Sequence, residues 1–161
     1  MGTMQIHIEA THLPGRDCAP GPGFPGRTGV HVGVQRKDRP GELLGVHPGD
    51  APSAGWTLEC DAVSTADGIV VSGPYVQNRL GGRFVYLSWG TVDGDGVFSM
   101  FRRAKLMLAD IDPGILSAAA LTGHLTARLR LTDELGRPRC ARVRPGDIEW
   151  SATPGPAAAG A

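Results

Sequence analysis

Two histidines and one carboxylate stand at polar positions of two early segments, residues 4–10 and 29–36, that alternate apolar and polar residues. The polar positions of both segments are Gln5, His7, Glu9, His31 and Gln35. If these segments are paired strands, the imidazoles and the carboxylate share one face, where they can bind a divalent metal or transfer protons. The same residues are also ordinary on the solvated face of a half-buried sheet. A metal-assisted enzyme that uses His7, Glu9 and His31 is therefore one alternative interpretation.

A cluster of basic residues, Arg102, Arg103 and Lys105, follows the apolar run of residues 84–89. Arginine presents a planar fork of donors and lysine a compact charge, so this cluster can hold a carboxylate or a phosphate. Residues 98–108 alternate in the manner of a strand, which puts Arg103 and Lys105 on one face and Arg102 on the other. The alternative is a solvated strand whose charges protect a sheet edge.

Aromatic residues and one amide form a third candidate site. Residues 73–77, Gly-Pro-Tyr-Val-Gln, supply a stiff turn that ends in the amide side chain. Trp56, Tyr86 and Trp89 can line an apolar cavity with such a polar group at its mouth. The alternative is that these rings only fill the core. The predicted ligand-binding residues are Trp56, Gln77, Tyr86, Trp89, Arg103 and Lys105.

Four aspartates, Asp93, Asp95, Asp110 and Asp112, lie close together in the sequence and carry the oxygen ligands that calcium prefers. They do not complete a twelve-residue calcium loop, and a turn followed by a helix cap accounts for all four. The sequence also lacks the serine-elbow, phosphate-loop and dinucleotide-binding motifs of common enzyme classes. We therefore predict no cofactor, and the residues do not decide whether the protein is an enzyme.

The chain has 161 residues, of which 41% are hydrophobic, and a formal net charge of zero. This length suits a single β domain, which we place at residues 1–152, and the lack of a basic excess argues against nucleic-acid binding. No segment approaches the roughly 20 apolar residues of a membrane span, and the N-terminus does not resemble a signal peptide. Residues 153–161 form a Pro/Ala/Gly tail that we expect to be disordered.

The three cysteines, Cys18, Cys60 and Cys140, are odd in number and form no Cys-x-x-Cys pair. They predict neither a disulfide framework nor a zinc knuckle, so reduced thiols in a cytoplasm fit best. Only Lys37 and Lys105 of the 16 basic residues are lysine, a bias that we attribute to a GC-rich, actinobacterial source.

Short alternating segments separated by Gly- and Pro-rich turns predict a mainly β fold. We expect an antiparallel two-sheet sandwich or a partly open barrel. Residues 83–92 are apolar on both faces, which is typical of a central strand covered on both sides. One short helix is predicted near 113–122, because Asp112 can cap it, Pro113 suits its first turn and Gly123 suits its end.

Six stretches of the chain together carry a family resemblance. They are Leu13–Gly15, Val32–Gln35, Gly73–Gln77, Arg83–Gly90, Phe101–Lys105 and Ile148–Trp150. Over residues 4–152 the chain resembles a family of small uncharacterised proteins found mainly in actinobacteria, a domain of unknown function. The resemblance implies no activity, cofactor or catalytic residue.

These observations lead to one principal hypothesis and two alternatives. The principal hypothesis is a small soluble β-sandwich that binds an apolar or amphipathic small molecule of actinobacterial metabolism, with or without cofactor-free chemistry such as cyclisation or isomerisation. The alternatives are a protein-interaction or structural module without catalysis, and the metal-assisted enzyme described above. The sequence leaves open whether the protein forms a homo-oligomer.

Overall fold

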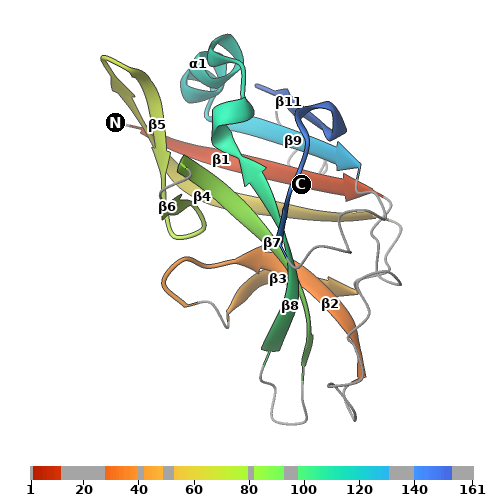
Figure 1. The fold of residues 1–161 in the computed structure, drawn as a ribbon. Helices are drawn as coiled ribbons and strands as arrows, with labels where there is room; N and C mark the ends of the chain where they lie inside the picture. The colour runs from red at the N-terminus through yellow and green to blue at the C-terminus, as the bar shows by residue number, and fades with distance from the viewer. Residues whose placement is uncertain are drawn as a thin grey trace.

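A computed structural model shows how these segments are arranged (Figure 1). The structure describes residues 2–11, 28–39, 42–48, 53–79, 82–92, 98–130 and 140–153. The prolines and glycines of residues 14–29 predict a surface loop, most of which lies outside these ranges. Asp93, Asp95 and nearly all of the predicted C-terminal tail also lie outside them. Strands dominate the described residues and form two sheets, accompanied by one α-helix. The predicted mainly β, two-sheet fold is therefore confirmed.

The first sheet has its five strands in the order β11, β9, β1, β4, β5. Their bounds are Ile148–Ser151 (β11), His124–Arg130 (β9), Gly2–Thr11 (β1), Ser53–Thr65 (β4) and Gly68–Ser72 (β5). The central strand β1 is antiparallel to β4 and parallel to β9. This parallel pairing places the N-terminal strand beside a segment from late in the chain (Figure 1).

The second sheet has the order β10, β8, β7, β2, β3, and β6 also pairs with β7. The bounds are Cys140–Arg142 (β10), Phe98–Met107 (β8), Gly82–Val92 (β7), Thr28–Gln35 (β2), Leu43–Pro48 (β3) and Gln77–Arg79 (β6). One edge of β7 pairs with β8, and its other edge is shared by β2 and the short β6. The basic segment after β7 is thus a strand, as predicted.

One hydrophobic core lies between the two sheets. Alternation along β4 buries Trp56 and Leu58 and turns Thr57 and Glu59 outward. The second sheet contributes apolar side chains such as Leu87, which is fully buried. Burial of this apolar surface supplies the main driving force for folding.

Strand β7 is buried on both of its faces, as its sequence predicts. Val85 and Leu87 belong to the core between the sheets. Phe84, Tyr86 and Ser88 alternate with them and so point to the opposite side of the second sheet, yet they are also buried. The outer side of this sheet is therefore not an ordinary solvated face.

Helix α1 spans Pro113–Thr122, the range predicted for it. The Asp112 carboxylate accepts a hydrogen bond of 2.8 Å from the N–H of Gly114, and Gly123 ends the helix with a φ of 81°. The helix packs against β1, β5 and β9 (Figure 1). Two short 3-10 helices complete the described elements, η1 (Leu108–Asp110) and η2 (Pro145–Asp147). Within the described ranges no helix has the length and apolar character needed to cross a bilayer.

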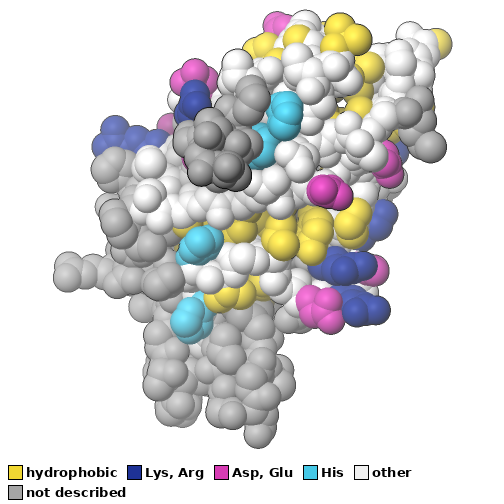
Figure 2. All heavy atoms as spheres, turned by 180° about the vertical axis from the view of Figure 1, so that it is seen from behind, with side chains coloured by type: hydrophobic (Ala, Val, Ile, Leu, Met, Phe, Trp, Pro, Cys, Tyr) yellow, Lys and Arg dark blue, Asp and Glu magenta, His cyan; other side chains and the backbone are white. Residues whose placement is uncertain are grey.

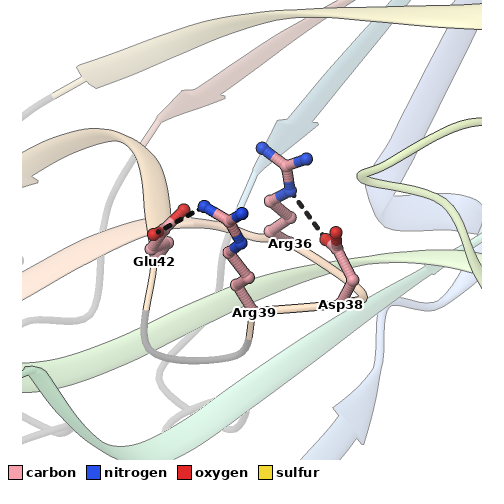
Figure 3. A network of polar contacts seen from close by, with 4 residues as sticks. All are labelled: Arg36, Asp38, Arg39 and Glu42. Carbon is pink, nitrogen blue, oxygen red and sulfur yellow. Dashed lines mark hydrogen bonds and ion pairs between the residues drawn. The ribbon is translucent and has the colours of Figure 1, made fainter.

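The connection between β2 and β3 carries two exposed ion pairs (Figure 3). Arg36 Nε lies 2.6 Å from Oδ1 of Asp38, and Arg39 Nη1 lies 3.4 Å from Oε1 of Glu42. The hydrogen bond from Arg36 lowers the pKa of Asp38 below its usual value. Exposed pairs of this kind contribute little to stability, so we regard them as features of a surface turn.

Candidate functional site

The metal interpretation assumed that the first two strands pair, and this assumption is wrong. β1 belongs to the first sheet and β2 to the second. His7 and Glu9 share one face of β1, whereas His31 lies opposite Gly90 of β7 in the other sheet. Figure 2 shows histidine side chains at the surface in separate places. Strand pairing therefore does not bring His31 to His7 and Glu9, and among the described residues no group of three or more potential metal ligands is found.

The aspartates of the calcium interpretation have other partners where the structure describes them. Asp110 forms an ion pair with Arg142, and Asp112 caps α1. Asp93 and Asp95 lie outside the described residues. Asp112 thus has the capping role that the alternative interpretation gave it, whereas Asp110 pairs with a distant arginine that the sequence did not indicate.

Two of the six predicted ligand-binding residues, Trp56 and Trp89, lie in the core between the sheets. Trp89 is only 1% exposed, and Trp56 donates a hydrogen bond of 2.6 Å from Nε1 to the carbonyl of Gly45. Neither residue lines the apolar cleft beside α1 or either of the two polar hollows on the first sheet. Alternation could not reveal this separation, because it does not say which face of a strand meets the other sheet.

The other four predicted residues come together on the outer side of the second sheet. Register places Lys105 opposite Tyr86, Arg103 opposite Ser88, and Gln77 opposite Phe84. These side chains alternate with core residues and so share the face that points away from the first sheet. We call this the aromatic face, and it comprises Gln35, Gln77, Phe84, Tyr86, Ser88, Arg103 and Lys105.

Two cations lie against two aromatic rings on the aromatic face. The Phe84 and Tyr86 rings meet edge to face, with centroids 4.8 Å apart. The Lys105 ammonium lies 4.8 Å from the Phe84 centroid, and the Arg103 guanidinium carbon lies 4.8 Å from that of Tyr86. Both distances are within the range of cation–π attraction. The rings therefore help to hold both cations over the sheet.

The aromatic face also carries two buried hydrogen-bond donors without partners. Ser88 donates a hydrogen bond of 2.9 Å to Oε1 of Gln35, so this pair is satisfied. In contrast, Nε2 of Gln77 and Nε of Arg103 are buried and have no acceptor among the described residues. A buried donor left in this state costs about 1–3 kcal/mol, which makes it a marker for an absent partner.

A second polar cluster lies on the outer side of the first sheet. The sequence identified His7 as a candidate residue of this cluster but not His124. His7 Nε2 lies 3.1 Å from Nδ1 of His124, and His7 Nδ1 lies 3.1 Å from Oγ1 of Thr57. The two imidazole rings are stacked, with an interplanar angle of 18°. His124 lies on β9, and the parallel pairing of β9 with β1 brings it beside His7. We call His7 and His124 the imidazole pair.

Burial lowers the pKa of His7. His7 is almost completely buried, and this lowers its pKa below the ordinary value of 6.5. The neighbouring His124 lowers the pKa of His7 further, and Glu9 opposes both effects. Glu9 itself is held by Arg128, whose Nε lies 3.0 Å from its Oε2. His7 is therefore a neutral imidazole near pH 7.

Three hollows among the described residues border strands of the first sheet. An apolar cleft of about 330 Å³ lies between β5, η1 and α1 and is lined by residues such as Ile69, Leu108 and Leu116. A polar hollow of about 340 Å³ lies beside His124, and one of about 580 Å³ lies beside Glu9 and Arg128. The imidazole pair thus has a hollow beside it, which is the setting that proton-transfer chemistry needs.

No curated protein and no solved structure matches this chain. The model of a family of unknown function, DUF5990, matches residues 4–153 and so covers nearly the whole chain, including both sheets and both polar clusters. The predicted resemblance to a domain of unknown function is therefore confirmed. The chain belongs to the DUF5990 family.

Proposed function

We propose that this protein binds an amphipathic small molecule on the aromatic face. The observation that carries the proposal is the pair of buried donors, Gln77 Nε2 and Arg103 Nε, which lack acceptors among the described residues. They flank Phe84 and Tyr86 on the same face. A ligand with an acceptor group for these donors and an apolar body for the rings satisfies both at once.

The charge of the aromatic face indicates that the ligand is an anion. No carboxylate of the described residues forms an ion pair with Arg103 or Lys105. Arg142 lies opposite Lys105 on β10, and its charge is offset by Asp110. A guanidinium and an ammonium group that form no ion pair within the described part of the chain favour a carboxylate or phosphate. The ligand class is therefore an aromatic or alicyclic small molecule with an acidic group.

In this proposal the ligand binds without a cofactor. Any reaction of the bound molecule is of the cofactor-free type, such as cyclisation or isomerisation. We also propose a cytoplasmic, actinobacterial setting, which the odd number of cysteines and the scarcity of lysine support. Burial raises the pKa of the Cys60 thiol to about 12, which accords with an unreactive, reduced cysteine.

The interaction-module alternative has less support. The large hydrophobic side chains that are exposed among the described residues are Val46 and Leu121, the latter 89% exposed. They lie on β3 and α1, which belong to different parts of the fold, so they do not indicate one continuous patch.

Calorimetric titration with naphthalene-2-carboxylate tests the proposal. Its neutral counterpart, 2-naphthylmethanol, shares the aromatic body and lacks the charge. We expect the carboxylate to bind more tightly than the alcohol. The Arg103→Ala/Lys105→Ala double variant should bind the carboxylate with at least tenfold lower affinity than the wild type. The matched control removes two exposed cations of β9 in the first sheet, Arg128→Ala/Arg130→Ala, and should bind the carboxylate like the wild type.

Two results would overturn the proposal. One is equal carboxylate affinity in the wild type and in the Arg103→Ala/Lys105→Ala variant. The other is binding that is lost when the apolar cleft is blocked by Leu116→Trp, because Leu116 lies on α1 and not on the aromatic face.

A further inference from the structure

We propose that Thr57, His7 and His124 form a proton-transfer site, with His124 as its catalytic residue and a small amine-bearing molecule as its substrate. The site lies on the first sheet, whereas the aromatic face lies on the second. The inference therefore does not depend on the function proposed above. It rests on three observations: a continuous hydrogen-bonded chain, a hollow at its end, and the charge of the rim.

The first observation is the contact between the two imidazoles. Nitrogen lone pairs repel each other, so two ring nitrogens 3.1 Å apart must share a proton between them. In one arrangement, His7 donates from Nε2 to His124, and its Nδ1 accepts from the Thr57 hydroxyl. In the other arrangement, His7 accepts at Nε2, and its Nδ1 donates to Thr57. The chain thus has two proton arrangements, and a shift between them moves one proton at each link.

The second observation concerns the far end of this chain. Nδ1 of His124 is occupied by His7, and no described residue bonds to its Nε2. His124 is half-buried and lines the hollow of about 340 Å³ together with Gln5, Glu59 and Gly123. Its outer nitrogen is therefore available to a molecule in this hollow, while His7 and Thr57 hold the ring from behind. His7 and Thr57 are positioning residues.

The third observation is the charge around the hollow. Glu59 lines it, and Asp61 lies on the same face of β4. Glu9 on β1 is paired with Arg128 on β9, and Glu149 lies opposite Arg128 on β11. Arg130 is a second cation on the same face of β9. The carboxylates around the imidazole pair still outnumber the cations, which favours a cationic, amine-bearing substrate over an anionic one.

These groups support an isomerisation that needs no co-reactant. His124 Nε2 takes a proton from one atom of the bound molecule and returns it to another atom of the same molecule. The imidazolium formed in between donates its Nδ1 proton toward His7 Nε2, which accepts it because His7 is neutral. Every proton that leaves the substrate returns to it, so atoms and charge balance.

A reporter reaction tests whether His124 is a competent base. In 5-nitrobenzisoxazole a base removes the ring C–H proton, the electron pair forms a nitrile, and the N–O bond breaks to release a coloured phenolate. We expect the wild type to catalyse this reaction, and His124→Asn and His124→Gln to lose at least nine-tenths of the rate. His47→Gln is the matched control, because His47 is also half-buried and bonded at one ring nitrogen but lies on the other sheet.

Rescue by a conservative variant separates a positioning role from a merely structural one. His7→Leu removes the acceptor of the His124 Nδ1 proton and should lower kcat, whereas His7→Gln keeps an acceptor oxygen and should recover most of it. Ethanolamine should inhibit the reaction at fixed ionic strength and propionate should not. The proposal is overturned if folded His124 variants keep the rate, if His7→Leu keeps the wild-type kcat, or if propionate inhibits more strongly. Micromolar Zn²⁺ binding that is lost in both His7→Leu and His124→Asn would also overturn it, in favour of a metal site.

Discussion

Gln35 and Gln77 are both buried on the aromatic face, yet only Gln35 has a hydrogen-bond partner for its amide among the described residues. Ser88 donates to Gln35, whereas Nε2 of Gln77 has no acceptor. Two similar amides on one face thus differ in whether a described residue satisfies their hydrogen bonds, and an unsatisfied buried donor is what marks the proposed binding site. This difference makes Gln35 the internal control for Gln77.

Replacement of Gln77 should stabilise the protein and lower its affinity for the ligand. Gln77→Leu removes a buried donor that has no acceptor, so we expect the free energy of unfolding to rise by about 1 kcal/mol. Gln35→Leu leaves the Ser88 hydroxyl without its acceptor and should lower the same free energy by about 1–2 kcal/mol. Urea unfolding measures both values. A loss of stability in Gln77→Leu would contradict the assignment of Gln77 as an unsatisfied group.

Replacement of the two core tryptophans should affect stability and not binding. Trp56→Phe removes a ring and its hydrogen bond to Gly45, whereas Trp89→Phe removes a ring whose Nε1 has no described partner. We expect Trp56→Phe to cost about 1 kcal/mol more than Trp89→Phe. Titration with naphthalene-2-carboxylate should give the wild-type affinity for both. A tenfold loss of affinity in Trp89→Phe alone would place this ring in the ligand site.

Acid should destabilise the protein through His7. Its folded-state pKa lies below 6.5, so as pH falls the unfolded chain takes up this proton first and becomes favoured. Stability contributed by neutral His7 is therefore present above about pH 7 and is lost below pH 6.5. Urea unfolding at pH 5, 6, 7 and 8 should show a flatter pH dependence in His7→Leu than in the wild type. Equal slopes in His7→Leu and the wild type would refute the assignment.

The helix cap gives a prediction that is independent of both sites. Asp112→Ala removes the carboxylate that accepts from Gly114 N–H, so the free energy of unfolding should fall by about 1 kcal/mol. Asp112→Asn keeps an acceptor oxygen and should recover most of this loss. Thermal unfolding followed by circular dichroism provides the measurement. Equal melting temperatures for the Ala variant and the wild type would show that the cap contributes nothing.

Local pattern predicted the elements well, because each element depends on neighbours in the sequence. Helix α1 was predicted from its cap and its terminal glycine. Alternation also put Arg103 and Lys105 on one face of β8. The three-residue strand β6, which carries Gln77 to that face, is too short to have a pattern of its own.

Long-range pairing explains what the sequence could not predict. The parallel pairing of β1 with β9 brings His124 to His7, and no local pattern specifies which distant strand a given strand will meet. For the same reason the assumed pairing of β1 with β2 was wrong. Trp89 and Tyr86 are equally apolar in sequence, and only the position of the first sheet decides that Trp89 faces the core.

Side-chain nuclear magnetic resonance tests the central claim most directly. The wild-type protein labelled with ¹⁵N is titrated with naphthalene-2-carboxylate while the Gln77 side-chain amide and the Arg103 Nε–H are observed. We predict that both signals move downfield in step with ligand concentration, because each donor gains an acceptor. Unmoved Gln77 and Arg103 signals together with shifts at Ile69 and Leu116 would contradict the claim and place the ligand in the cleft beside α1.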